Sequence, residues 1–572
     1  MKRILPLILV LFIACSKKSK VSQDKVIDVA LISNISSIDP AISYDTVSAE
    51  VVYQVYEPLY EYEYLTRPLK LKPLLAQSMP DISEDKLTYT FKIKKGIQYH
   101  NHPSFEGEKR FVRAQDFILA IKRLAYLPTK ANGWWLFDNK VKGLDEFRKK
   151  AKTLSDLLSL DVEGLKLIDD YTFRIHLTQP YAQLIYAFSM AFTTPIPFEA
   201  VKYSNNNLEE LEVGTGPFIL GSWDKSLKVT LVKNPDYRQE LYPTHGDRVA
   251  NESGFLKDAG KRLPLVDGVT FHIMKEAQTQ WLNFLDKKLD LLVLRKNHFS
   301  IVLDPKGDLQ ERFQGKGINL QAVPSMTYWW LAFNMNDPLV GKNLNLRRAI
   351  SSAISRKKFV KSFTNNIGLT ANSFLPPGIP GYNPSAKLPY SYDVKKAKDY
   401  LAKAGYPGGK GLPVIKYDVR GTDTMSRQIG EFVKKELSEV GIKIEVVINS
   451  FPAFLNKVRT GQLQFWYGGW GMDYPDPENV VQLLISANVS PGPNYANFKS
   501  PIVDAAYEKL KKGVTKGKEL NEVLSSVEKV VSEQRPWSML YYARDYILTH
   551  DYLKNLREAK VILNKYKYLR LE

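Results

Sequence analysis

The amino-acid sequence predicts an α/β protein that contains a parallel sheet. The clearest observation is a strand–helix–strand pattern in the second half of the chain. Val414–Arg420 and Ile442–Ile448 have the composition of strands, and Ser426–Val440 carries apolar residues at helical spacing. Gly441 ends this helix, and the connections are short. The pattern is typical of a βαβ unit, in which the two strands are parallel and the crossover is right-handed.

The rest of the chain supports the same fold class, because further strands and helices are expected along it. The 572 residues are enough for about three domains. Apolar residues make up 44% and charged residues 25%, as in ordinary globular proteins. The strands are expected at Val26–Ile32, Leu87–Ile93, Leu165–Leu177, Val213–Trp223, Leu227–Val232, Val269–Ile273 and Gln464–Gly468, and the other helices at Tyr44–Tyr64, Ala114–Leu124, Gln278–Leu289 and Asp393–Ala404.

The N-terminus has the features of an export signal. After a short basic start, the apolar run Ile4–Ala14 is about half of the ~20 residues that a membrane span needs. Cys15, the only cysteine, follows directly, as in a bacterial lipobox whose cysteine becomes acylated. We expect a signal peptide at 1–14, lipidation of Cys15 and a polar tether at 15–23. The alternative is a plain signal peptide with an incidental cysteine.

The net charge of +19, from 80 basic and 61 acidic residues, has several possible meanings. The lysines are spread along the chain, without an arginine-rich block or a nucleic-acid motif. We therefore expect no nucleic-acid partner and interpret the charge as a solvated surface suited to an anionic envelope. No second apolar stretch reaches ~18 residues, so the body of the protein is expected to be soluble.

No motif for catalysis, phosphate binding or metal binding stands out. The sequence lacks a G-x-S-x-G nucleophile elbow, and Gly405–Gly411 (GYPGGKG) has the wrong spacing for a phosphate loop. His100 and His102 lie close together but are more typical of a polar loop than of a metal site. We expect a non-enzymatic protein without catalytic residues, metal or cofactor.

Gly469–Pro477 (GWGMDYPDP) is the best candidate for a ligand site. It directly follows the expected strand Gln464–Gly468, which comes after the βαβ unit. Open α/β sheets bind their ligands beyond the carboxyl ends of the strands. The motif is therefore expected to line such a site.

An ordered series of segments resembles the family-5 extracellular solute-binding proteins, the receptors of ABC importers for oligopeptides, dipeptides and nickel. Each segment alone is weak, and the resemblance depends on their number and order over nearly the whole mature chain. The main segments are Ser37–Ala41 (SIDPA), Val55–Tyr60 (VYEPLY), Leu87–His100, Phe111–Leu124, Val213–Phe218 (VGTGPF), Leu331–Asn334 (LAFN), Leu346–Arg356, Pro376–Tyr382, Asp393–Pro407, Glu431–Ile444 and Gly469–Pro477.

The resemblance implies a two-lobed periplasmic-binding-protein-like fold of class II. An extra domain belongs to lobe I, and a two-strand hinge joins lobes that close on the ligand. The hinge crossings are expected near Tyr328–Asn334 and Leu540–Asp545. Mapped onto the chain, lobe I comprises 24–53, 195–327 and 545–572, the extra domain 54–194, and lobe II 328–544.

The resemblance also implies a role for Asp473. In peptide-binding members, the Asp of a GW-x-x-DY motif pairs with the α-amino group of the peptide. A buried ammonium needs such a carboxylate, and the bond is stronger in a closed cleft than in water. Gly469 and Gly471 would let a peptide main chain approach and pair as an added strand, and Trp470 would form a wall. The structural alternatives are a turn cap at Asp473 and a core position for Trp470.

Tyr328 and Trp329, beside the hinge, are further ligand-contact candidates, with interlobe core as their alternative. Asp476 is interpreted as structural. Some oligopeptide receptors carry a basic residue six positions before the motif's Asp, where it helps to bind the peptide carboxylate. This chain has Tyr467 there, so the carboxylate partner and the accepted peptide length stay open.

The leading hypothesis is a peptide receptor of an ABC importer, anchored by lipid to the outside of a bacterial membrane. Its expected partners are a peptide, the permease subunits and the membrane, and it is expected to be a monomer. One alternative keeps the fold but binds a nickel chelate, haem or an oligosaccharide. Another is an envelope lipoprotein that acts as an adhesin or sensor.

Overall fold

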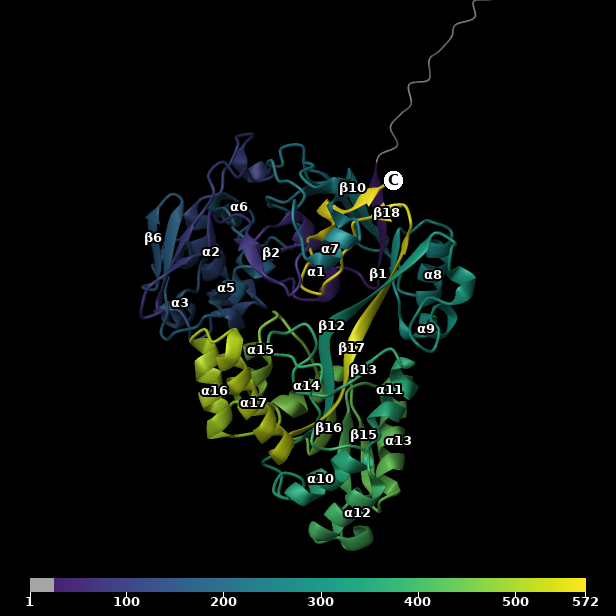
Figure 1. Ribbon diagram of the computed structural model, residues 1–572. Coiled ribbons are helices and arrows are strands. Elements are labelled where there is room, and N and C mark those ends of the chain that lie inside the picture. Colours follow the sequence, from purple (N-terminus) through teal and green to yellow (C-terminus); the bar gives the residue numbers. More distant parts are fainter. Residues whose placement is uncertain (1–24) are drawn as a thin grey trace, which may run out of the picture.

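A mixed sheet of eleven strands runs through residues 25–572, the part of the chain that the computed structural model describes (Figure 1). The predicted signal peptide, Cys15 and the tether lie outside these residues. The strands are β1 Val26–Leu31, β8 Phe218–Asp224, β9 Lys228–Lys233, β10 Gly268–Ile273, β11 Leu291–Val293, β12 Ile318–Phe333, β13 Leu369–Thr370, β14 Ile415–Val419, β15 Ile444–Ile448, β16 Phe465–Gly471 and β17 Trp537–His550. Their order is β15-β14-β16-β12-β17-β11-β1-β10-β9-β8, and β13 pairs with β17 beside that path.

Two long strands, β12 and β17, connect two lobes, as Figure 1 shows. Near one end Leu320 and Leu548 pack in one apolar core, and near the other Trp330 and Met539 pack in another. Between these cores the pairing of the two strands is irregular from Pro324 to Tyr328. A proline has no backbone N–H to donate to a sheet, which suits this break. The two-lobed fold with a two-strand hinge is thus confirmed, and the break lies just before the first predicted crossing and inside the second.

The second lobe contains the predicted βαβ unit. Strands β14 and β15 pair in parallel, and α13 (Thr424–Ser438) lies between them in the chain. Asp423 caps this helix by accepting a hydrogen bond from the backbone N–H of Ser426, and Gly441 follows with a φ of +93°. The parallel pairing predicted from the sequence is confirmed.

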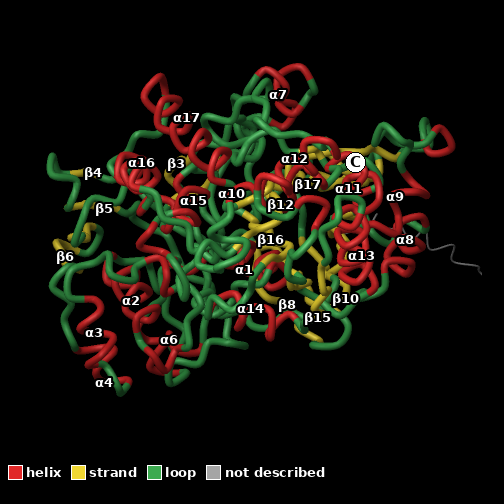
Figure 2. Tube along the Cα trace, turned by 90° about the horizontal axis from the view of Figure 1, so that it is seen from below, coloured by secondary structure: helices red, strands yellow, loops and turns green. Residues whose placement is uncertain are grey.

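Helices cover both faces of the sheet in the second lobe, as the view from below shows (Figure 2). One face packs against α10 to α13 and the other against α14 to α17, and the two faces belong to separate apolar cores. The helices not yet given bounds are α10 Leu344–Ala353, α11 Arg356–Thr364, α12 Val394–Lys403, α14 Phe451–Arg459, α15 Glu478–Val481, α16 Pro501–Lys511 and α17 Gly517–Gln534.

The first lobe combines the other half of the large sheet with smaller sheets. A four-stranded sheet has the order β4-β5-β7-β6, and β2 pairs with β3 and β18 with β19. One apolar core joins this small sheet to β1 and β10, so the predicted boundaries of the extra domain at 54 and 194 stay a prediction. The small strands are β2 Tyr60–Tyr62, β3 Leu71–Pro73, β4 Asp81–Ile82, β5 Thr88–Lys92, β6 Leu165–Asp169, β7 Thr172–His176, β18 Leu553–Lys554 and β19 Arg570–Leu571.

One predicted helix of the first lobe is wrong over its second half. The structure has α1 at Thr46–Val55, after which the chain turns into β2 instead of continuing as helix to Tyr64. Pro58 explains the end, because proline cannot continue a helix. Within residues 25–572, none of the helices combines the length and hydrophobicity of a membrane span. The other helices are α2 Ala114–Ala125, α3 Leu144–Lys150, α4 Leu154–Ser159, α5 Leu184–Ala187, α6 Phe198–Tyr203, α7 Arg248–Glu252, α8 Ala277–Leu285 and α9 Lys296–Val302.

Candidate ligand-binding site

A cavity of about 1080 Å³ lies between the two lobes. Tyr44 lines it from the segment before α1, and Trp135 and Tyr181 line it from the region around the small sheet. From the second lobe come the carboxyl end of β14, strand β16 with Asp473 just after it, helices α14 and α16, and Trp330 of β12 and Trp537 of β17. The cavity therefore borders the carboxyl ends of β14 and β16, the end of a sheet at which such folds bind ligands.

The motif Gly469–Pro477 begins on the strand and not in a loop. Strand β16 continues to Gly471, and Gly469 pairs with Trp329 while Trp470 pairs with Tyr328. The chain then leaves the sheet, which brings the next side chains to the cavity. Strand pairing thus holds the first three residues of the motif rigidly.

Asp473 sits at the cavity with neutral partners on both carboxylate oxygens. The Tyr44 hydroxyl donates to Oδ1 at 3.1 Å from the other lobe, and Asn479 Nδ2 donates to Oδ2 at 3.2 Å. Burial raises the pKa of Asp473, and the hydrogen bonds from Asn479 and Tyr44 and the charge of Lys560 oppose that rise only in part. Asp473 forms no ion pair with any other residue in 25–572. A partly buried carboxylate without an ion pair is stabilised when a cation binds next to it.

Asn479 fixes the geometry of two site residues at once. Its side-chain oxygen accepts from the indole Nε1 of Trp470 at 3.1 Å and from the backbone N–H of Asp473 at 3.2 Å. Asn479 is fully buried on the short helix α15. Sequence analysis missed this residue. It lies only six residues after Asp473, close enough along the chain for its side chain to reach back to Asp473.

The structure brings some of the predicted site residues to the cavity and leaves others away from it. Asp473, Trp470 and Gly469 line the cavity. Tyr328 is fully buried in the core of the second lobe, where its ring lies 5.2 Å from that of Trp330. Side chains alternate between the two faces of β12, and that of Tyr328 points into the apolar core. It therefore reaches no ligand in this conformation.

Trp329 and Gly471 are also absent from the cavity lining. Trp329 stacks on Tyr467 with ring centroids 5.0 Å apart. A side chain at Gly469 would meet the Trp329 ring at 2.2 Å, and one at Gly471 would meet Lys560 Nζ at 2.5 Å. Both glycines therefore make room for side chains of the protein itself.

Arg420 is a cationic lining residue that sequence analysis did not single out. It follows β14, and its guanidinium lies 5.1 Å from the ring centroids of both Trp329 and Phe451. Burial lowers its pKa, and it forms no ion pair with any other described residue. Its position at the carboxyl end of a predicted parallel strand was the available signal. Asp473 and Arg420 are thus two charged groups of the cavity lining without an ion pair in the described residues, and Asp138, Lys140, Arg459, Glu508 and Lys511 also line the cavity.

Beside the cavity, the two lobes touch through a buried carboxyl group. Asp476 accepts hydrogen bonds from Gln183 Nε2 at 3.4 Å and from the Tyr186 hydroxyl at 3.5 Å, both in the first lobe. Glu478 accepts from the Tyr474 hydroxyl at 2.6 Å. Burial raises the pKa of Asp476 to about 6 and that of Glu478 to about 7. This contact belongs to the state in which the lobes are together.

The other sequence candidates lie elsewhere in the molecule. His100 bonds to the Gly216 carbonyl and to Glu212, and His102 to Ser104. Among residues 25–572, no group of three or more His, Cys, Asp or Glu side chains is placed to hold a metal ion. Both histidines therefore take part in hydrogen bonds within the first lobe, away from the cavity.

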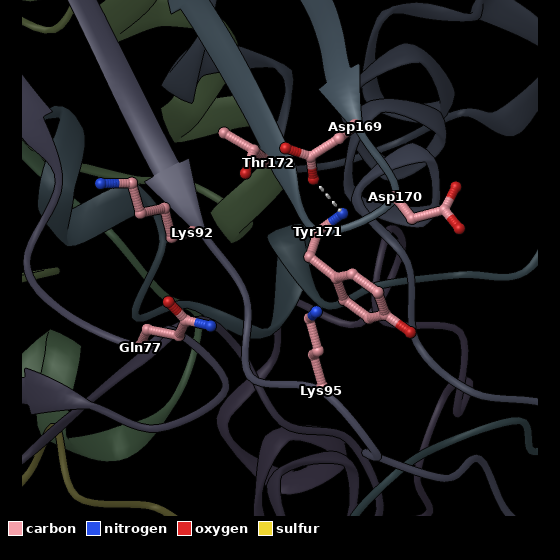
Figure 3. A pocket seen from close by; sticks show the side chains of 7 residues that line it. All are labelled: Gln77, Lys92, Lys95, Asp169, Asp170, Tyr171 and Thr172. Carbon is pink, nitrogen blue, oxygen red and sulfur yellow. Dashed lines mark hydrogen bonds between the residues drawn. The ribbon is translucent and has the colours of Figure 1, made fainter.

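A second hollow of about 590 Å³ lies on the small sheet (Figure 3). Asp169 and Asp170 lie at its turn, and Lys92 and Lys95 stand apart from each other. Lys92 pairs with Asp81 at 2.9 Å, and both side chains are substantially exposed. Exposed pairs of this kind contribute little, so these charges are a solvated surface.

Two lobes, a two-strand hinge and a cavity with unpaired charges between them define a solute-binding protein. A sequence profile described as bacterial extracellular solute-binding proteins, family 5 Middle, matches residues 70–491. The chain belongs to this family, as the sequence resemblance predicted. Members bind solutes and are not enzymes, which confirms the prediction of a non-enzymatic protein.

Known relatives are similar over most of their length. The chain is 25% identical to heme-binding protein A of Haemophilus influenzae over 495 residues, 85% of this chain and 81% of that one. It is 25% identical to the dipeptide-binding protein of Escherichia coli over 77% of this chain and 76% of that one. The names of these two relatives point to different ligands, haem and dipeptides.

Solved structures show the same fold. The ABC transporter-associated periplasmic binding protein DppA from Helicobacter pylori, in complex with the peptide STSA, gives a TM-score of 0.71 at 24% identity, covering 96% of this chain and 98% of that one. HbpA2 from Haemophilus parasuis gives a TM-score of 0.74 at 20% identity, covering 96% and 100%.

Proposed function

We propose that the protein is the extracytoplasmic substrate-binding lipoprotein of an ABC importer and that it binds peptides between its lobes. The observation that carries the proposal is Asp473, a partly buried carboxylate in the interlobe cavity that has hydrogen-bond partners but no ion pair within residues 25–572, although Lys560 is near enough to lower its pKa. A peptide's α-ammonium would be the missing partner. Because Tyr44 reaches Asp473 from the other lobe, binding of the ammonium would be coupled to lobe closure.

The backbone of β16 suits a peptide main chain. Strand β14 pairs with β16 only at Phe465 and Trp466 in the described chain, while β12 pairs with β16 as far as Gly471. Beyond Trp466, the edge of β16 that faces away from β12 is therefore open. An extended ligand could add hydrogen bonds there without regard to its side chains.

Arg420 is our candidate for the carboxylate end of the ligand. Its flanking aromatic rings hold the guanidinium in place, and a guanidinium can bind a carboxylate with two parallel hydrogen bonds. This proposal fills the gap that Tyr467 left in the sequence analysis. Peptides carry both of the groups that Asp473 and Arg420 would bind.

Haem is the alternative ligand, supported by a specific observation. Trp135, Trp330, Trp466, Trp470 and Trp537 all line the cavity, and a large flat ligand can stack on indole rings. The similarity to heme-binding protein A of Haemophilus influenzae points the same way. Asp473 and Arg420 nevertheless favour a peptide over haem, because a peptide carries both an ammonium and a carboxylate group.

The ligand class can be read directly by mass spectrometry. The protein from residue 24 onward would be purified from its host, denatured, and its released small molecules analysed. A ladder of peptide masses supports the proposal, whereas haem alone would overturn it. Calorimetry with di- to pentapeptides then tests affinity, and N-acetylated peptides are expected to bind poorly because they lack the ammonium.

The membrane anchor is a separate part of the proposal. Lipidation of Cys15, with 15–23 as a tether, would hold a monomeric receptor at the outer surface of a membrane beside its permease. The Cys15→Ser variant is expected to move from the membrane fraction to the soluble fraction. If this variant stays with the membrane, acylation at Cys15 is wrong.

A further inference from the structure

A turn of the first lobe brings Lys560 to the hinge. The backbone N–H of Ile562 donates to the carbonyl of Ala559 at 2.9 Å, which closes the turn with Lys560 inside it. Ala559 and Ile562 are buried in an apolar core of the first lobe, and Val561 packs against cores of both lobes. The turn is therefore held in place on both sides, and it presents Lys560 where the lobes meet.

Gly471 provides the space that the Lys560 ammonium occupies. Nζ of Lys560 donates to the Thr327 hydroxyl at 3.0 Å, and Thr327 pairs with Gly471 across β12 and β16. A Cβ atom added to Gly471 would lie 2.5 Å from this nitrogen, so a larger residue would displace the ammonium. Gly471 ends β16 two residues before Asp473. A cation thus rests at the strand end from which the acidic anchor follows.

Lys560 is the cation that acts on Asp473. Burial raises the pKa of Asp473, and Lys560 is the charged group that opposes this rise. Burial lowers the pKa of Lys560, while Asp545 and Asp473 oppose that change. The ammonium forms no ion pair with any residue in 25–572 and does not line the cavity, so it takes neither oxygen of Asp473. The other titratable groups that face Asp473 are phenols, which stay neutral because burial raises their pKa values well above the usual range: Tyr44, Tyr181 and Tyr328.

Burial and the nearby cation have opposite effects on Asp473. A buried carboxyl group favours its neutral form, and a neutral Asp473 has no charge to offer an ammonium. A cation beyond ion-pair distance favours the charged form without competing for the oxygens. We propose that Lys560 is a positioning residue of the amine anchor: its ammonium, seated on Gly471, keeps the Asp473 carboxylate negatively charged and leaves its oxygens to the ligand's amine. The inference deepens the proposed function and rests on it, because it applies to a ligand that binds Asp473 through a cation.

The expected signature is a pH profile of affinity. Without Lys560, the pKa of Asp473 in the ligand-free protein rises further, so a cationic amine must displace a proton at higher pH. In calorimetry with Ala-Ala-Ala between pH 8 and pH 4.5, Lys560→Met should lose about threefold to tenfold more affinity than the intact protein, the range for one opposite charge beyond ion-pair distance. At about pH 8 Asp473 is ionised in both proteins, and the variant should bind as tightly or up to about tenfold more tightly, because a charge that repels the ligand's ammonium is gone.

Two further variants and a control assign the effect to the ammonium. Lys560→Arg keeps a cation on the same turn and should keep the profile of the intact protein. Gly471→Ala retains Lys560 but places a methyl group against its nitrogen, and since Gly471 has no positive φ, the flexible lysine moves and the profile should shift as in Lys560→Met. Lys434→Met removes an exposed ammonium from α13 and should leave the profile unchanged. Asp476 and Glu478 also titrate in this range, but they are the same in all these proteins.

The charge of Asp473 can also be measured without a ligand. In protein with isotope-labelled aspartate, NMR follows the carboxyl carbon of Asp473, which is identified by its loss in Asp473→Asn. This carbon should titrate at higher pH in Lys560→Met and in Gly471→Ala than in the intact protein. Asp545 also faces Lys560, and Asp545→Asn identifies its signal, so the two titrations stay distinct.

The outcomes separate this inference from the proposed function. An identical titration of Asp473 with and without the Lys560 ammonium would overturn the inference. So would a loss of affinity in Lys560→Met that is equal at every pH, because a purely structural role gives that result. Absence of binding for every peptide would overturn the proposed function, while the ligand-free titration would still show whether Lys560 sets the charge of Asp473. Thermal unfolding shows whether Lys560→Met is folded, and Gly471→Ala decides the question if it is not.

Discussion

Replacing Asp473 by asparagine separates a ligand anchor from a structural turn. The Asp473→Asn side chain would keep nearly the same shape and could still accept a hydrogen bond from Tyr44 or Asn479. What the variant loses is the negative charge. Since burial raises the pKa of Asp473 even with Lys560 nearby, removing this charge should leave the ligand-free protein equally stable or slightly more stable.

The expected loss of affinity follows from the same geometry. Two opposite charges about 4 Å apart interact with roughly 4 kcal/mol at the effective dielectric of a protein surface, and a hydrogen-bonded contact is closer. Loss of one partner of a desolvated pair costs about 2–5 kcal/mol. At about 1.4 kcal/mol for each factor of ten, Asp473→Asn should weaken peptide binding by about 30-fold to several thousandfold.

Calorimetry with one tripeptide and its N-acetylated form measures this effect, and thermal unfolding without ligand measures stability. N-acetylation should weaken binding to the intact protein but have little further effect on Asp473→Asn. Asp138→Asn, which removes an exposed carboxylate from the same cavity lining, is the control and should change affinity by less than about threefold. Unchanged affinity together with lower stability would refute the reasoning, because Asp473 would then act as a turn cap.

Three further predictions use the same assays. Arg420→Gln should weaken peptides with a free carboxylate by about 10-fold to 100-fold and leave C-terminally amidated peptides almost unaffected, since only the former lose an ion pair. Asn479→Ala should lower both affinity and ligand-free stability, the latter by about 1–3 kcal/mol, because it frees the buried groups held around Asp473. The pKa values of Asp476, about 6, and Glu478, about 7, are raised by burial, so the closed state retains protons that the open state releases. Closure should therefore weaken as the pH rises from about 4, where carboxyl groups of ordinary pKa ionise, and this weakening should level off above about pH 7. Small-angle scattering between about pH 4 and pH 8 can show this change, and Asp476→Asn with Glu478→Gln should flatten the profile.

Local structure can be predicted well where short-range chemistry decides it. The apolar spacing after β14 indicates a helix, and Gly441 marks its end because glycine readily adopts a positive φ. The long helix expected from Tyr44 to Tyr64 is wrong in its second half, because Pro58 outweighs the helical periodicity around it. Proline removes a backbone donor and clashes with the preceding turn, which costs more than several favourable residues contribute.

The candidate site could be predicted only in part. Asp473 stands out from its motif, and Arg420 could have been found as the residue after a parallel strand. Tyr44 could not, because its hydroxyl reaches Asp473 across 429 residues of chain. Tyr328 and Trp329 were both candidates, yet neighbours on a strand point to opposite faces, and only packing shows which faces are covered.

By itself, the sequence determined the α/β class, the βαβ unit, the family and the position of the acidic motif after a strand. The class, the βαβ unit and the position of the motif depend on residues near one another in the chain, and the family depends on the order of segments along it. Only the tertiary structure decided that Gly469 and Gly471 accommodate Trp329 and Lys560, and that Gly468 accommodates the indole rings of Trp330 and Trp466. The physical reason is that the sequence shows only that a glycine has no side chain. Which group fills the space beside the glycine depends on residues that are distant in the chain and meet only in the folded protein.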